Sequence, residues 1–118
     1  MARKHYLGSC QCGAVSFEAD ADLDRTVVCN CSRCQRLGSV LTFVAREDFT
    51  LKSGEDNLSE YLFNSRNIHH TFCKTCGIQS FSYGTTPDGS EMVALNVNCL
   101  DGVNPRELDP QAYDGAAI

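Results

Sequence analysis

Short apolar segments, each bounded by polar turn residues, run through most of the chain. Within residues 15–20, Val15, Phe17 and Ala19 alternate with polar side chains, a pattern that places the apolar side chains on one face of a half-buried strand. Similar segments predict further strands at 40–45, 49–52, 58–63, 68–72, 78–83 and 92–97. We therefore expect a mainly β protein built from short strands.

One short helix is expected among these strands, over residues 32–37. Ser32 followed by Gln35 matches a capping box, in which a serine cap and a glutamine three residues later satisfy the first amides of a helix. Gly38 is a natural end for this helix. Cys34 would then lie in the first turn, where the positive end of the helix dipole favours a thiolate.

Length and composition fit one domain that spans residues 1–118. A chain of 118 residues with 42% hydrophobic and 21% charged residues is typical of a globular protein with one modest core. Glycine and proline interrupt residues 101–118, so we expect an irregular tail packed on the sheet, with a turn of helix near 105–107.

The net charge and the N-terminal sequence limit which classes of partner and which cellular compartment we expect. The formal net charge is −5, and metal-bound thiolates would make it more negative. Because phosphate binding needs a basic face, we expect no nucleic-acid partner; retention on heparin or DNA at physiological salt would contradict this. The N-terminus shows no apolar segment of a signal peptide, and no apolar run is long enough to span a membrane. A cytoplasmic protein with no membrane partner is expected.

Seven of the eight cysteines fall into three clusters. The clusters at 10–13 and 73–77 are paired cysteines followed directly by glycine, which is typical of a zinc knuckle because the backbone turns tightly around the metal. One structural zinc site, which would couple metal binding to folding, is expected at Cys10, Cys12, Cys73 and Cys76. The alternatives are that the first pair joins the third cluster, or that the cysteines form disulfides. A reducing compartment and the Cys-X-Cys spacing disfavour disulfides.

The third cluster, Cys29, Cys31 and Cys34, has no evident fourth protein ligand. A zinc ion held by three protein ligands keeps a position open, either to activate a water or to bind an incoming thiol as its thiolate, and a sulfur-rich site suits the second use. His69 and His70 are candidates for the fourth ligand. Two adjacent strand residues, one pointing inward and one outward, explain the same pair without a metal.

Four other residues carry weaker signals. Arg33 and Arg36 flank the third cysteine and are candidates for binding the carboxylates of an anionic thiol, although arginines on a helix are usually solvated. Cys99 is expected to be a buried apolar thiol, since cysteine often behaves as a small hydrophobic residue. His5 is expected to be a solvated residue near the terminus.

The motifs at residues 8–17, 29–36, 72–77 and 95–101 resemble the glutathione-dependent formaldehyde-activating enzyme family, which also includes centromere protein V. The resemblance covers nearly the whole chain. It implies a β-tent fold of stacked antiparallel sheets held by zinc. It also implies a structural zinc at Cys10, Cys12, Cys73 and Cys76, and a catalytic zinc at Cys29, Cys31 and Cys34. Asn30 departs from the family pattern, in which histidine is frequent at this position.

The activity implied by the resemblance is addition of glutathione to formaldehyde, a carbon–sulfur lyase reaction that gives S-hydroxymethylglutathione. We therefore expect a two-zinc enzyme that acts on a small thiol or its aldehyde adduct. The alternatives are a non-enzymatic zinc module that binds a macromolecule, and a zinc or redox sensor whose three-cysteine site releases metal on oxidation. The sequence identifies neither a proton donor nor an oligomeric state.

Overall fold

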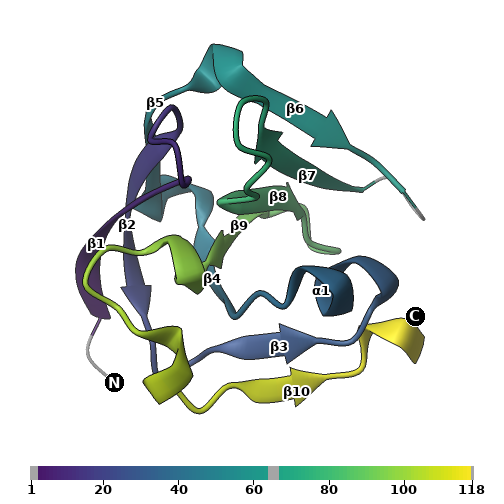
Figure 1. Cartoon of the computed structure of the whole chain (residues 1–118). Coiled ribbons are helices and arrows are strands. Elements are labelled where there is room, and N and C mark those ends of the chain that lie inside the picture. The colour runs from purple at the N-terminus through teal and green to yellow at the C-terminus, as the bar shows by residue number, and fades with distance from the viewer. Residues whose placement is uncertain (1–2, 64–66, 118) are drawn as a thin grey trace.

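The computed structural model describes residues 3–63 and 67–117, and its strands form two sheets (Figure 1). The smaller sheet has the order β1 (Arg3–Ser9), β2 (Ser16–Asp22), β5 (Phe49–Ser53). The larger has the order β10 (Gln111–Tyr113), β3 (Val27–Cys29), β4 (Leu41–Ala45), β9 (Glu91–Asn96), β8 (Phe81–Thr85), β7 (Ile68–Cys73), β6 (Leu58–Tyr61). Neighbouring strands are antiparallel except β10 and β3, which are parallel. The expected mainly β class is confirmed.

Among the residues that the structure describes, helical structure is limited to short segments. The α-helix α1 (Ser32–Leu37) has the bounds expected from the sequence, and it lies between the β6 end and the β3–β10 end of the larger sheet (Figure 1). The remaining helical segments are single 3₁₀ turns at Arg46–Asp48, Glu55–Asn57, Val97–Cys99, Pro105–Glu107 and Gly115–Ala117. The turn at Pro105–Glu107 confirms the helical turn expected in the tail.

The core joins the two sheets through aromatic side chains. Phe17 of β2, Phe49 of β5 and Phe81 of β8 are all buried, with ring centroids 4.7–6.1 Å apart. The alternation expected along β2 is confirmed, because its odd-numbered apolar residues are buried and its polar residues are only partly so. Sterics explain why residue 8 of β1 is a glycine: a Cβ on Gly8 would clash with the Phe17 ring. The Phe17 ring therefore lies directly against the backbone of the neighbouring strand β1.

Three strands, β1, β3 and β10, were not predicted from the sequence. Strand β1 pairs with β2 along its whole length, yet most of its side chains are exposed, so it shows no apolar alternation. Strands β3 and β10 have three residues each and pair with one another across 84 positions of the chain. Two predicted strands were also too long by more than one residue at one end: β6 ends at Tyr61, and β8 begins at Phe81.

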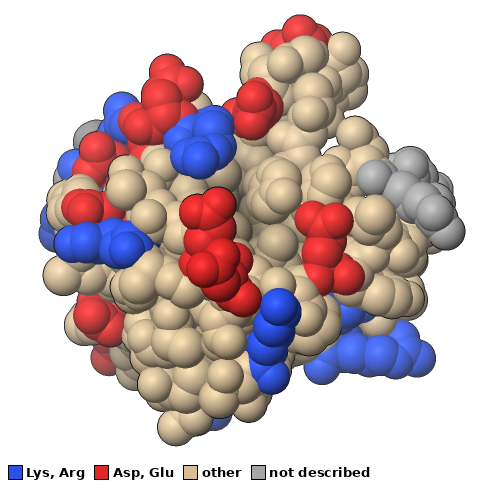
Figure 2. Space-filling view, turned by 90° about the horizontal axis from the view of Figure 1, so that it is seen from above, with Lys and Arg blue, Asp and Glu red and all other residues tan. Residues whose placement is uncertain are grey.

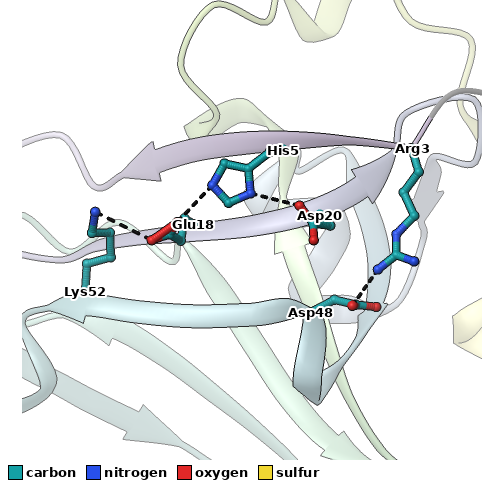
Figure 3. A network of polar contacts seen from close by, with 6 residues as sticks. All are labelled: Arg3, His5, Glu18, Asp20, Asp48 and Lys52. Atoms are coloured by element: carbon teal, nitrogen blue, oxygen red, sulfur yellow. Dashed lines mark hydrogen bonds and ion pairs between the residues drawn. The ribbon is translucent and has the colours of Figure 1, made fainter.

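Charged side chains connect β1, β2 and β5 across the exposed face of the smaller sheet (Figure 3). His5 lies between two carboxylates, with Nδ1 2.8 Å from Asp20 and Nε2 2.8 Å from Glu18. The hydrogen bond to Asp20, helped by Glu18, raises the pKa of His5. His5 is thus exposed as expected, but it is a cross-strand ion-pairing residue rather than a solvated one. These contacts give a polar strand such as β1 a fixed register.

Acidic and basic side chains are interspersed on the face that Figure 2 shows, where they do not gather into a continuous basic patch. Within the described ranges, no helix has the length and apolar character needed to cross a bilayer.

Candidate metal centres

Two hairpin-like turns from different sheets bring four cysteine sulfurs together. Cys10 and Cys12 follow β1, whereas Cys73 ends β7 and Cys76 lies in the turn after it. All four Sγ atoms lie within 4.8 Å of one another, and the Cys10–Cys12 and Cys12–Cys73 pairs are 3.7 and 3.6 Å apart. A tetrahedron with Zn–S bonds of about 2.3 Å has S–S edges of about 3.8 Å. The donor type and spacing therefore fit a zinc ion.

The backbone of both turns is shaped around the sulfurs. Gly13 and Gly77 have φ of 83° and 80°, the left-handed conformation that a side chain resists, and each donates its N–H to the carbonyl of the first cysteine of its turn. Amide N–H groups of Cys76 and Thr75 lower the pKa of Cys73 to about 6. The turn thus stabilises a thiolate, which is the form that binds a metal.

Asn57 is a partner of this site that sequence reasoning missed. Its Nδ2 donates hydrogen bonds to Cys73 Sγ at 3.2 Å and to Thr75 Oγ1 at 3.1 Å. Its carbonyl also accepts from the Lys74 N–H. Asn57 ends the 3₁₀ turn before β6, and no local pattern links that turn to a cysteine 16 residues later. Residues that orient a metal ligand in this way are known to affect metal affinity.

The second group consists of Cys29 at the end of β3, and Cys31 and Cys34 at the start of α1. Their Sγ atoms also lie within 4.8 Å of one another, and all three residues are partly buried. Three thiolates this close repel each other, so a bound cation would be needed to hold all of them deprotonated. The donor chemistry suits zinc, and the three sulfurs leave one tetrahedral position for a further ligand.

The cap of α1 differs from the expected one. The N-cap is Cys31, whose Sγ accepts the Cys34 N–H at 3.3 Å, so the capping box that begins at Ser32 is wrong. Cys34 lies in the first turn of the helix as expected, but burial, followed by the neighbouring sulfurs, raises its pKa to about 12. Burial opposes ionisation of Cys31 as well, but amide and thiol hydrogen bonds outweigh it and lower the pKa of Cys31. Cys31 therefore caps the helix, and its thiol ionises more readily than an ordinary cysteine thiol.

The C-terminal segment covers one side of this group. Asn30 accepts the Ala116 N–H at 2.9 Å and donates Nδ2 to Asp114 at 2.9 Å, and its own N–H donates to the Tyr113 carbonyl. A Cβ on Gly115 would lie 2.5 Å from Cys29 Sγ. Asn30, the departure from the family pattern, therefore holds the tail against the sulfurs, although the tail was expected only to pack on the sheet.

We expect Gly115→Ala to weaken metal binding at the three-cysteine group. The added methyl would displace either the tail or Cys29, and changes that disturb the support of a metal ligand reduce affinity by about 10–100-fold. Zinc retained after dialysis against a weak chelator measures this. Lys4→Ala, an exposed residue of β1 that belongs to neither cysteine group, is the control and should retain zinc as the wild type does. Equal retention in Gly115→Ala would show that the tail does not support Cys29.

Neither candidate histidine joins the second group among the described residues. His69 Nδ1 lies 2.7 Å from Glu60 Oε2, and its ring stacks on Tyr83. His70 is buried and stacks on Phe63, with ring centroids 5.0 Å apart. One histidine points inward and the other outward, which confirms the explanation that needs no metal.

The positions of the cysteine sulfurs decide between the remaining alternatives for how the cysteines are grouped. Cys10 and Cys12 group with the second knuckle rather than with the third cluster, and none of the eight cysteines forms a disulfide. Cys99 belongs to neither group, and burial raises its pKa. It is partly buried, so the expected buried thiol is less enclosed than predicted, although it is not a metal ligand in either group.

Comparison with known proteins agrees with these two groups. A family model described as glutathione-dependent formaldehyde-activating enzyme matches residues 5–114, which include every cysteine of both groups. The chain belongs to this family. It is also similar to a crystal structure of a Rhodobacter sphaeroides protein, with 34% sequence identity, a TM-score of 0.81, and coverage of 91% of this chain and 98% of that one. Family membership points to a zinc-binding role related to glutathione or formaldehyde.

Proposed function

We propose that residues 1–118 form one zinc domain that catalyses the reversible addition of a small thiol, such as glutathione, to an aldehyde. The reaction resembles that of S-hydroxymethylglutathione synthase, a carbon–sulfur lyase. The observation that carries the proposal is the contrast between the two groups. Four sulfurs complete one tetrahedron, whereas three sulfurs without a histidine leave a position for a substrate.

The two groups would have different roles. Cys10, Cys12, Cys73 and Cys76 would hold a structural zinc between the two sheets. Cys29, Cys31 and Cys34 would hold the catalytic zinc, which when bound would stabilise a thiolate at neutral pH. The C-terminal tail, which Asn30 binds and which lies against Cys29 at Gly115, would keep Cys29 in place and screen it from water. All three cysteines of the second group are partly buried, whereas the first group has Cys10 and Cys73 in the core, Cys76 partly buried and Cys12 at the surface.

The proposed reaction balances without a redox partner. The substrate thiol loses its proton, and its sulfur forms a bond to the carbonyl carbon. The π electron pair of the carbonyl moves to oxygen, which takes up a proton to give the hydroxymethyl thioether. The reverse step breaks the same C–S bond. Holding both reactants at one site is the main contribution expected of the protein, since the addition also proceeds unaided.

Exchange spectroscopy by NMR tests this proposal. The wild-type protein should raise the exchange rate between formaldehyde plus glutathione and their adduct, in proportion to protein concentration and without changing the equilibrium. Cys34→Ala should not. Cys99→Ala, which removes a cysteine outside both groups, is the matched control and should behave as the wild type. A wild-type rate equal to that of buffer would refute the formaldehyde reaction.

A zinc or redox sensor is the second candidate, because the sulfurs of Cys29, Cys31 and Cys34 are partly exposed and within reach of an oxidant. Peroxide would then release one zinc reversibly, and the protein would not accelerate the thiol–aldehyde exchange. The exchange measurement thus separates the two candidates.

A further inference from the structure

A cavity of about 450 Å³ lies between α1 and the chain just after β6. We call it the α1 pocket; its lining residues are Ser32, Arg33, Arg36, Leu37, Tyr61 and Phe63. Its volume falls within the range of small-molecule sites. Its two walls differ in chemistry, because α1 contributes two arginines and the opposite side contributes two aromatic rings.

The arginine wall is fixed in position and its charge is not neutralised. Arg33 donates from Nε and Nη2 to Gln79 Oε1, at 3.1 and 2.7 Å, and its guanidinium lies 4.9 Å from the centre of the Tyr61 ring. Arg36 donates from Nη1 to the Ser32 carbonyl at 2.8 Å. These acceptors are neutral, and within residues 3–63 and 67–117 neither arginine pairs with a carboxylate. Two unpaired positive charges in an acidic protein favour an anionic ligand.

The opposite wall of the pocket is aromatic. Tyr61 and Phe63 are stacked with centroids 5.6 Å apart, and Tyr61 is 48% exposed despite its large apolar ring. Behind them, Phe63 stacks on His70, which is 7% exposed and whose Nδ1 has no hydrogen-bond partner in the described part of the chain. Burial, followed by the charge of Arg33, lowers the pKa of His70, so the imidazole is neutral and adds no charge to the pocket. The wall therefore favours an uncharged flat group.

The pocket adjoins the three-cysteine group. Arg33 directly precedes Cys34, and Leu37 follows Cys34 by three residues, a spacing that makes two side chains neighbours on a helix surface. The arginine wall of the pocket therefore comes from the same short helix that carries Cys34.

We propose that the α1 pocket binds the non-reacting part of the substrate, and that this part is an acid with a flat apolar group, its carboxylate against the arginines and its ring against Tyr61 and Phe63. That the ligand is a substrate rests on the proposed function. The pocket narrows the substrate class from thiols in general to thiols that carry an acid and a flat apolar group. Glutathione offers carboxylates but no ring, so it would use the arginine wall alone.

Phenylacetate is the probe, because it has the acid and the ring but no thiol and its binding does not depend on thiol chemistry. In titrations followed by amide NMR, it should shift the signals of residues 32–37 and 61–63 saturably. Acetate, which lacks the ring, and benzyl alcohol, which lacks the charge, should bind much more weakly. Arg36→Gln, which loses a charge-assisted hydrogen bond, should weaken phenylacetate binding about tenfold, and Tyr61→Leu should weaken it as well. Arg106→Ala removes an exposed arginine that does not line the pocket, and it should leave phenylacetate binding unchanged.

The outcomes separate this inference from the proposed function. Saturable binding of phenylacetate with loss in Arg36→Gln supports the pocket even if no thiol–aldehyde exchange is found. Absence of saturable shifts, equal affinity for acetate, or full affinity in Arg36→Gln overturns the pocket even if glutathione exchange is accelerated.

Discussion

Cys73→Ala is expected to unfold the protein, whereas Cys34→Ala should leave it folded with one zinc ion fewer. Cys73 is 1% exposed, and its sulfur lies 3.6 Å from that of Cys12, 61 residues away in the chain and attached to the other sheet. Binding of a structural zinc contributes about 10–16 kcal/mol in small zinc peptides, whereas whole proteins are stable by about 5–15 kcal/mol. Loss of that site therefore removes a free energy comparable to the entire stability.

The three cysteines of the second group lie within six residues of chain, so their metal closes a short local loop. Circular dichroism melts together with zinc content measure both variants, and Cys99→Ala is the control for loss of a partly buried thiol. If Cys34→Ala unfolds as completely as Cys73→Ala, the division into a structural and a catalytic group is wrong.

Glutathione should raise the melting temperature of the zinc-loaded protein, and S-methylglutathione should do so much less. A ligand that binds the native state at ten times its Kd stabilises it by about 1.4 kcal/mol, which corresponds to several degrees for a protein of this size. The methylated compound keeps every carboxylate but has no ionisable thiol. The difference between the two ligands therefore reports the sulfur contact alone.

Cys34→Ala is the matched variant for this comparison, and in it the difference between the two ligands should disappear. Equal stabilisation of the wild type by both compounds would show that recognition lies away from the three-cysteine group.

The features that were predicted from the sequence depend on local patterns. The paired cysteines with their glycines identify two turns that meet in space, and the alternation around Phe17 identifies β2 and its buried face. The helix at 32–37 was found because its length and its end at Gly38 are set locally. In each case the physical cause lies within a few residues of chain.

The features that were missed depend on contacts between distant segments. Strand β1 is stabilised by pairs such as His5 with Glu18 and Asp20, which leave no apolar pattern. Asn30 binds a tail 84–86 residues away. Ser32 matched a capping box, but the preceding cysteine occupies the cap because its sulfur accepts the Cys34 amide.

Native mass spectrometry of the purified protein, with and without glutathione, tests the central claim most directly because it counts metal ions and bound thiols together. The wild type should carry two zinc ions and bind one glutathione, Cys99→Ala should match it, and Cys34→Ala should carry one zinc ion and bind none. A wild-type chain with a single zinc ion, or a Cys34→Ala chain that keeps two and still binds glutathione, would contradict a three-cysteine zinc site that is open to a thiol.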